Sequence, residues 1–272
     1  MSRERRRILI GLDSSPTSLR GLAAAAEMAA RLDAELVGLF VEDDNLLRLA
    51  ELPNSFEIGL RSARSRHLDP EVIARLFRQM AERARVAVVR AAEREHVRCS
   101  FEVARGSMIG QLLQAMAISS GGSGEHRRSR PQRLASGGGA PSIILMQGQV
   151  CVFPAGKAVI VLDDGHFSTG RLPVALDLAD ESCAGELLFV VVSDSLINAR
   201  RQVGKVREFL ELEGRTAPIK ILPSLEVDYF LALLENESCG TLIFSACPKL
   251  TDRDLIRRLV DEINYPIFLI GH

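Results

Sequence analysis

Short apolar segments alternate with longer helical segments along the whole chain, and this alternation occurs twice. In the first half, RILIGLD (7–13) and AELVGLFVED (34–43) have the length and branched apolar content of buried parallel strands, and an alanine-rich helical segment separates them. In the second half, KAVIVLDD (157–164) and GELLFVVVSD (185–194) repeat this order. Strands that alternate with helices predict parallel βαβ units in an open α/β sheet.

The two halves align as an internal repeat. Asp13 aligns with Asp163 near the start of each half, and near the ends Ile118 aligns with Ile243 and Pro141 with Pro266. This predicts two tandem α/β domains, residues 1–148 and 157–272, joined at a segment broken by proline and glycine. The extra residues of the first half lie mainly in 44–69, which we expect to be irregular apart from one short helix. The alignment makes Ala117–Ser120 the fourth strand of the first domain.

Composition excludes several classes of protein. The 272 residues include 34 basic and 35 acidic side chains, so no overall positive charge favours nucleic acid or an anionic membrane. The five cysteines form no CxxC pair, which argues against a disulfide framework and a structural zinc site and indicates a reducing compartment. No apolar run approaches the length of a membrane span and the basic start lacks a secretory apolar region. We therefore expect a cytoplasmic protein.

The opening block ILIGLDSSPTSLRGLAAAAEMAARLDAELVGLFVED (8–43) resembles the universal stress protein family. The closing segments APSIILM (140–146) and YPIFLI (265–270) are similar to the last strand of that family. The resemblance implies two Rossmann-like sheets of strand order 3-2-1-4-5. It also implies that the last strands, Ser142–Met146 and Pro266–Ile270, pair antiparallel across a pseudo-twofold. One chain then mimics the family's dimer, or two tandem chains associate.

The resemblance also implies a possible adenine-nucleotide site in the first domain. Its members that bind nucleotide use an acid after the first strand, a valine backbone near the end of the second, and a glycine loop after the fourth strand. Glycines let backbone N–H groups approach a phosphate, and the following helix adds positive potential. The matching residues here are Asp13, Val41, Gly121, Gly124, Arg128 and Ser129.

The same residues also have a structural interpretation. The spacer between Gly124 and Arg128 has only the three residues EHR, too short to wrap a triphosphate, and Arg128 stands where the family has glycine. Arg128 either compensates with charge or fills the crevice by pairing with Asp13. The second domain has ACPKLTDRD (246–254) at this place, without glycine and with carboxylates at the next helix start, which repel phosphate.

The sequence therefore leaves two functions open. No G-x-S-x-G, Walker A or paired Cys/His motif supports an enzyme. The leading expectation is a non-catalytic stress-response or regulatory protein that binds an unidentified protein partner and needs no metal. The alternative is a sensor that binds ATP or AMP in the first domain only.

Overall fold

The first domain of the expected pair is built on parallel strands whose side chains alternate between two apolar layers. The computed structural model describes residues 6–12, 16–53, 55–58, 65–119, 142–146, 156–163, 171–182, 186–245, 253–263 and 265–271. Its N-terminal half contains β1 (Arg7–Leu12), α1 (Pro16–Arg31), β2 (Glu35–Glu42), α2 (Asp44–Glu51), β3 (Phe56–Ile58), β4 (Ser65–His67), α3 (Pro70–Glu95), β5 (Cys99–Arg105), α4 (Met108–Ser119) and β6 (Ser142–Met146).

The C-terminal half repeats the alternation of strands and helices. It contains β7 (Lys157–Asp163), α5 (Leu172–Ser182), β8 (Leu187–Val192), α6 (Leu196–Leu212), β9 (Ile219–Leu222), α7 (Val227–Asn236), β10 (Cys239–Ser245), α8 (Arg253–Glu262) and β11 (Ile267–Ile270). Its strands lie in the order β9-β8-β7-β10-β11, which is the expected order 3-2-1-4-5. All neighbours in this half are parallel.

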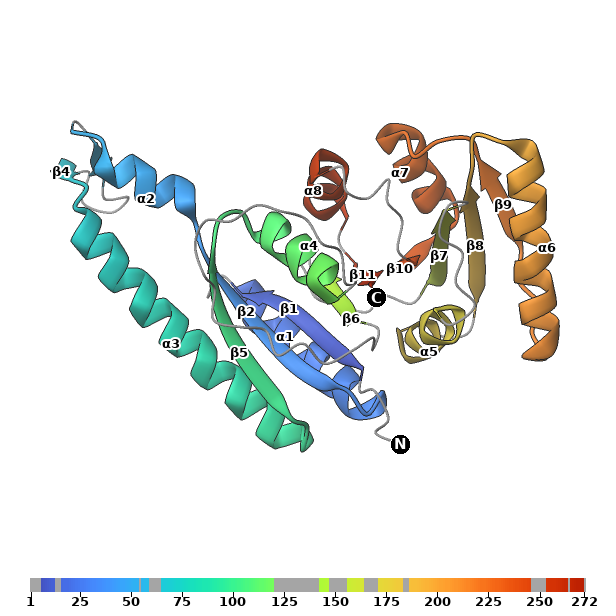
Figure 1. Ribbon diagram of the computed structural model, residues 1–272, viewed down its shortest axis with the longest axis horizontal. Coiled ribbons are helices and arrows are strands. Elements are labelled where there is room, and N and C mark those ends of the chain that lie inside the picture. Colours follow the sequence, from blue (N-terminus) through green and yellow to red (C-terminus); the bar gives the residue numbers. More distant parts are fainter. Residues whose placement is uncertain are drawn as a thin grey trace.

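The two halves share one nine-stranded sheet (Figure 1). Strand β6 pairs antiparallel with β11, with Ile144 opposite Leu269 and Met146 opposite Ile267. The pairing of the two last strands, expected across a pseudo-twofold, is thus confirmed. It also covers what would otherwise be an exposed edge on each half. The domain limits at 148 and 157 stay a prediction.

Side-chain alternation divides the core between the two faces of the sheet. On β7, Ile160 packs with one apolar cluster and Val161 with the other. The first cluster also takes residues from α1, α3, α5 and α6, and the second from α4, α7 and α8. Helices therefore cover both faces of the sheet, as parallel strands require.

One predicted strand is wrong. Residues 117–119 of the expected fourth strand belong to helix α4, and β1 pairs directly with β6, with Arg7 opposite Ser142. The expected order 3-2-1-4-5 therefore fails in the N-terminal half, whose order in the described residues is β5-β2-β1-β6. A short apolar run continues a helix as readily as it forms a strand, and here it continues helix α4.

The segment between β2 and α3 carries more structure than expected. The predicted short helix is confirmed as α2, but β3 and β4 also form a small antiparallel hairpin, with Phe56 opposite His67. Helix α3 then runs for 26 residues, capped at its start by Asp69 and ended by His96 in the left-handed conformation. Its buried residues follow helical spacing: Ile73, Phe77, Ala81, Ala84, Val88 and Ala92.

Candidate functional site

The expected nucleotide site lies at the carboxyl edge of β1, β2 and β5. These strands are parallel and in register, so their last residues meet at one edge, with Glu42 opposite Arg105. Val41 is the only predicted site residue among those the structure describes. Its side chain is 7 % exposed and packs in the apolar cluster that includes Leu112 of α4. The contact of its backbone with a nucleotide, which the resemblance implies, stays a prediction.

The other predicted site residues lie outside the described residues: Asp13, Gly121, Gly124, Arg128 and Ser129. The structure does not describe their positions relative to Val41, so this site stays a prediction. The structure contradicts one expectation on which this predicted site was based. The glycines were expected to follow a fourth strand, which would end at the carboxyl edge, but the described chain before residue 120 is helix α4.

Helix α4 begins at this carboxyl edge. Gly11 lies near the end of β1, and a Cβ atom added there would be 2.5 Å from the sulfur of Met108, the first residue of α4. The helix has 12 residues, and each residue advances about 1.5 Å along the axis. The chain therefore leaves the described region at the far end of α4, away from the edge where Val41 lies.

An ion pair that sequence reasoning missed occupies the same edge. Arg105 Nε donates to Glu42 Oε2 at 2.7 Å, and the Glu42 side chain is only 12 % exposed. The next turn is held by Gly106, which has a φ of 133° and donates its N–H to the Glu42 carbonyl at 3.0 Å. Only the strand register pairs Glu42 with Arg105, because 63 residues separate them in the sequence.

The carboxyl edge of the C-terminal half carries several buried polar residues. Asp163 ends β7 and Ser245 ends β10, and both are buried. Asp163 lies opposite Val192 of β8, and Ser245 lies opposite Leu162 of β7. This edge lies where the chain order of the strands reverses between β7 and β10, the usual place for ligands in open α/β sheets.

Arg171, which sequence reasoning did not single out, stands at the start of the helix that follows β7 in the chain. It directly precedes α5 and is 4 % exposed. Burial lowers the pKa of its guanidinium. The sequence contains a pattern that could have pointed to Arg171. The segment GRLPVALDLAD (170–180) has one arginine at the start of a largely apolar helical stretch.

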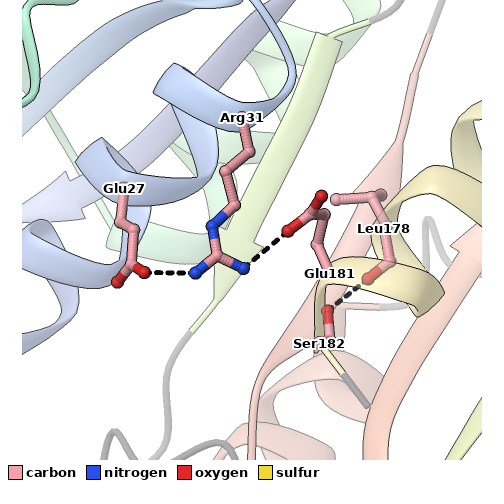
Figure 2. Close-up of polar contacts among 5 residues, drawn as sticks. All are labelled: Glu27, Arg31, Leu178, Glu181 and Ser182. Atoms are coloured by element: carbon pink, nitrogen blue, oxygen red, sulfur yellow. Dashed lines mark hydrogen bonds and ion pairs between the residues drawn. The ribbon is translucent and has the colours of Figure 1, made fainter. Parts of the chain in front are cut away.

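Polar contacts also join the two halves on one face of the sheet (Figure 2). Arg31 of α1 donates to Glu27 at 2.5 Å and, across to α5, to Glu181 at 2.6 Å. The hydrogen bond to Glu181, together with Glu27, raises the pKa of Arg31. Arg6 makes a second bond of this kind to Asp177 of α5, at 2.6 Å. These contacts connect α5 to the N-terminal half.

Neither a metal-binding cluster nor a membrane-spanning helix occurs among the described residues. No group of three or more histidine, cysteine or acidic side chains in the described residues could hold a metal ion. Nor is any of the described helices both long enough and apolar enough to cross a membrane.

Comparisons with known proteins give matches in structure alone. No family model matches the sequence, and no curated protein matches it. The fold is similar to a crystal structure of a universal stress protein from Archaeoglobus fulgidus, with 13 % identity, a TM-score of 0.54, and 98 % of each chain covered.

Two further solved structures match with lower TM-scores. A putative universal stress protein from Pseudomonas aeruginosa has 13 % identity and a TM-score of 0.46, with 98 % of this chain and 93 % of that chain covered. The cytoplasmic domain of a prokaryotic cation chloride cotransporter has 12 % identity and a TM-score of 0.43, with 98 % and 95 % covered.

Proposed function

Because the chain has the fold of a universal stress protein, we propose that it is a cytoplasmic stress-response or regulatory protein. It acts by binding another protein and not by catalysis. It is organised as two tandem domains, residues 1–148 and 157–272. The non-catalytic part of this proposal rests on the sequence, which has no G-x-S-x-G, Walker A or paired Cys/His motif.

An exposed apolar arm is the structural feature that best supports binding to another protein. We define the arm as residues 43–83, which include α2, the β3–β4 hairpin and the first half of α3. Figure 1 shows α2, β4 and the start of α3 extending beyond the edge of the sheet. Large apolar side chains on the arm are 43 to 70 % exposed: Leu49, Leu52, Phe56, Ile58, Val72 and Leu76.

Exposed apolar side chains gathered on one projecting element are typical of an interaction surface. Phe56 and Ile58 are two residues apart on β3, so they lie on the same face of the hairpin. Phe56 also contacts the ring of His67 edge to face, with the centroids 5.6 Å apart, which fixes the orientation of its ring.

The charge of the arm indicates what kind of partner it binds. The segment 43–83 contains seven arginines and seven carboxylates, so it carries no net charge. A nucleic acid or an anionic membrane requires an excess of positive charge. A balanced, partly apolar surface instead favours a protein that presents its own apolar patch with a polar rim.

A matched pair of double variants tests this function. Phe56→Ser with Ile58→Ser changes the arm, whereas Leu196→Ser with Ile197→Ser changes a similarly exposed apolar pair at the start of α6. In native pull-downs, we expect a partner protein to bind to wild type and to the α6 variant. The arm variant should not retain this partner. Equal retention by both variants would contradict the proposal. So would a self-association in sedimentation that only the arm variant abolishes, since the partner would then be a second copy.

Adenine-nucleotide sensing by the N-terminal half is the alternative function. Calorimetry with ATP, ADP and AMP at low salt distinguishes the two. We expect no heat of binding at millimolar nucleotide, because residues 117–119, which were expected to form the strand that presents the glycine loop, belong to helix α4. Micromolar binding that Asp13→Ala abolishes would establish the alternative.

A further inference from the structure

A buried arginine lies at the start of helix α5 without a described partner. The Arg171 carbonyl accepts the N–H of Ala175 at 2.9 Å, so its backbone closes the first turn of α5. The residue is 4 % exposed. The Nε and Nη1 atoms are buried and have no hydrogen-bond partner. In the described part of the chain, no carboxylate forms an ion pair with Arg171.

A buried Arg171 guanidinium without a counter-charge is energetically unfavourable in the protein without a ligand. A guanidinium has five N–H donors and no acceptor, and arginine keeps its proton in proteins even where burial lowers its pKa. A buried charge is costly unless a counter-charge and hydrogen bonds compensate for the lost water. Arg171 therefore requires a group with negative charge and several acceptor oxygens.

The N-terminus of helix α5, which Arg171 precedes, also favours a negatively charged group. The start of a helix carries partial positive charge and unpaired N–H groups, so a cation there is unfavourable and an anion is favourable. The first turn of α5 holds no acidic residue, and an arginine side chain cannot accept a capping hydrogen bond. By contrast, α3 and α6 are capped by the acceptor side chains of Asp69 and Ser195.

We propose that Arg171 and the N-terminus of α5 together bind the phosphate group of a small molecule, either free phosphate or a phosphate monoester. The forked guanidinium and the N–H groups of Leu172 and Val174 are complementary to its oxygens, whereas Pro173 between them has no N–H. The position agrees with this, because α5 follows β7 at the carboxyl edge where the strand order reverses. The inference does not depend on the proposed function, and it assigns a ligand to the half in which the glycine loop is missing.

Thermal unfolding at constant ionic strength tests the site with inorganic phosphate as the probe. We expect the midpoint temperature of wild type to rise by a few degrees as phosphate replaces chloride, since ligand bound only to the folded state stabilises it. Arg171→Met removes the buried charge and keeps an apolar stem. We expect this variant to unfold at a higher temperature than wild type without phosphate, and to show no response to phosphate. Arg207→Met, at an exposed arginine of α6, should leave both values unchanged.

Two results would overturn the proposal. One is a phosphate response of Arg171→Met equal to that of wild type. The other is a lower midpoint of Arg171→Met in phosphate-free buffer, which would mean that the guanidinium has a structural partner. Arg171→Lys keeps the charge without the fork, so it should need more phosphate for the same shift. If the methionine variant fails to fold, an unchanged response of the lysine variant overturns the proposal.

Further probes identify the source of the phosphate group. A response to glycerol 2-phosphate at lower concentration than to inorganic phosphate would assign the site to a phosphate monoester, and the reverse order to free phosphate. Either order supports the proposal. Acetate, which offers a carboxylate at the same ionic strength, should give no shift. An equal shift with acetate would overturn the assignment to phosphate.

Discussion

Gly38 in the middle of β2 determines how closely helix α3 packs on the sheet. A Cβ atom added at this position would be 2.5 Å from Val88 Cγ2, and Val88 is fully buried and stiff because it is β-branched. We expect Gly38→Ala to lower the free energy of unfolding by about 1–3 kcal/mol, the usual cost of overpacking a core. Urea unfolding followed by circular dichroism measures this change.

Gly204 provides the matched control. It lies in helix α6, is exposed, and an added Cβ atom would meet no other group within 4 Å. Gly204→Ala should therefore raise the free energy of unfolding by roughly 0.5–1 kcal/mol, because alanine favours the helix. Equal effects of the two substitutions would show that α3 does not approach β2 as closely as described.

Single residues also show where sequence reasoning reached its limit. The short, branched apolar runs at β1 and β7 identified both strands correctly. The residues of the carboxyl edges were harder to predict. Glu42 and Arg105 meet only because β2 and β5 align in one register, and Arg171 becomes unusual only once its burial is known. Sequence patterns report the period of an element but neither its register nor what covers it.

At the scale of elements, Glu237 links the end of α7 to two strands. Lys220 of β9 and Lys157 of β7 both donate to its carboxylate, the latter at 3.0 Å, and they lower the pKa of Glu237. A lowered pKa in the folded state gives stability that is present above the ordinary glutamate pKa of about 4.3 and is lost as pH falls below it.

In the Glu237→Gln variant, the free energy of unfolding should therefore change less with pH in the acidic range than it does in wild type. We expect the variant to be less stable than wild type at neutral pH, with the difference decreasing as pH falls below about 4. Urea midpoints between pH 3 and pH 7 test this. A constant difference across that range would mean that ionisation of Glu237 does not contribute.

The wrongly predicted strand shows a second limit. The alignment of the two halves placed Ile118 on Ile243, and this assigned 117–119 to a strand because Ile243 lies in one. In this chain no helix-breaking residue separates the apolar run from the preceding residues of α4, so the helix continues through it. Repeat alignment transfers secondary structure only where the local pattern of apolar residues is also repeated.

At the scale of the whole molecule, two kinds of contact join the halves. Ion pairs such as Arg31 with Glu181 lie near the surface between α1 and α5, whereas the β6–β11 pair lies in the sheet. Exposed ion pairs contribute little, typically below about 1 kcal/mol. We expect Arg31→Met to lower the free energy of unfolding by less than that, and by even less at high salt. A loss above about 2 kcal/mol would show that the helix contact holds the halves together.

Strands β6 and β11 join both halves into one sheet. Disulfide trapping tests this pairing most directly. Ile144 lies opposite Leu269 in this antiparallel pair. Opposite residues have Cα atoms about 4.5–5.5 Å apart, within the range a disulfide spans. The control Ile144→Cys with Phe268→Cys is one residue out of register, so its two side chains point to opposite faces.

After mild oxidation, peptide mapping of the monomer identifies the bond. We predict that Ile144→Cys with Leu269→Cys forms an intramolecular disulfide and that the control does not. No such bond, or equal yields in the two variants, would contradict the joined sheet.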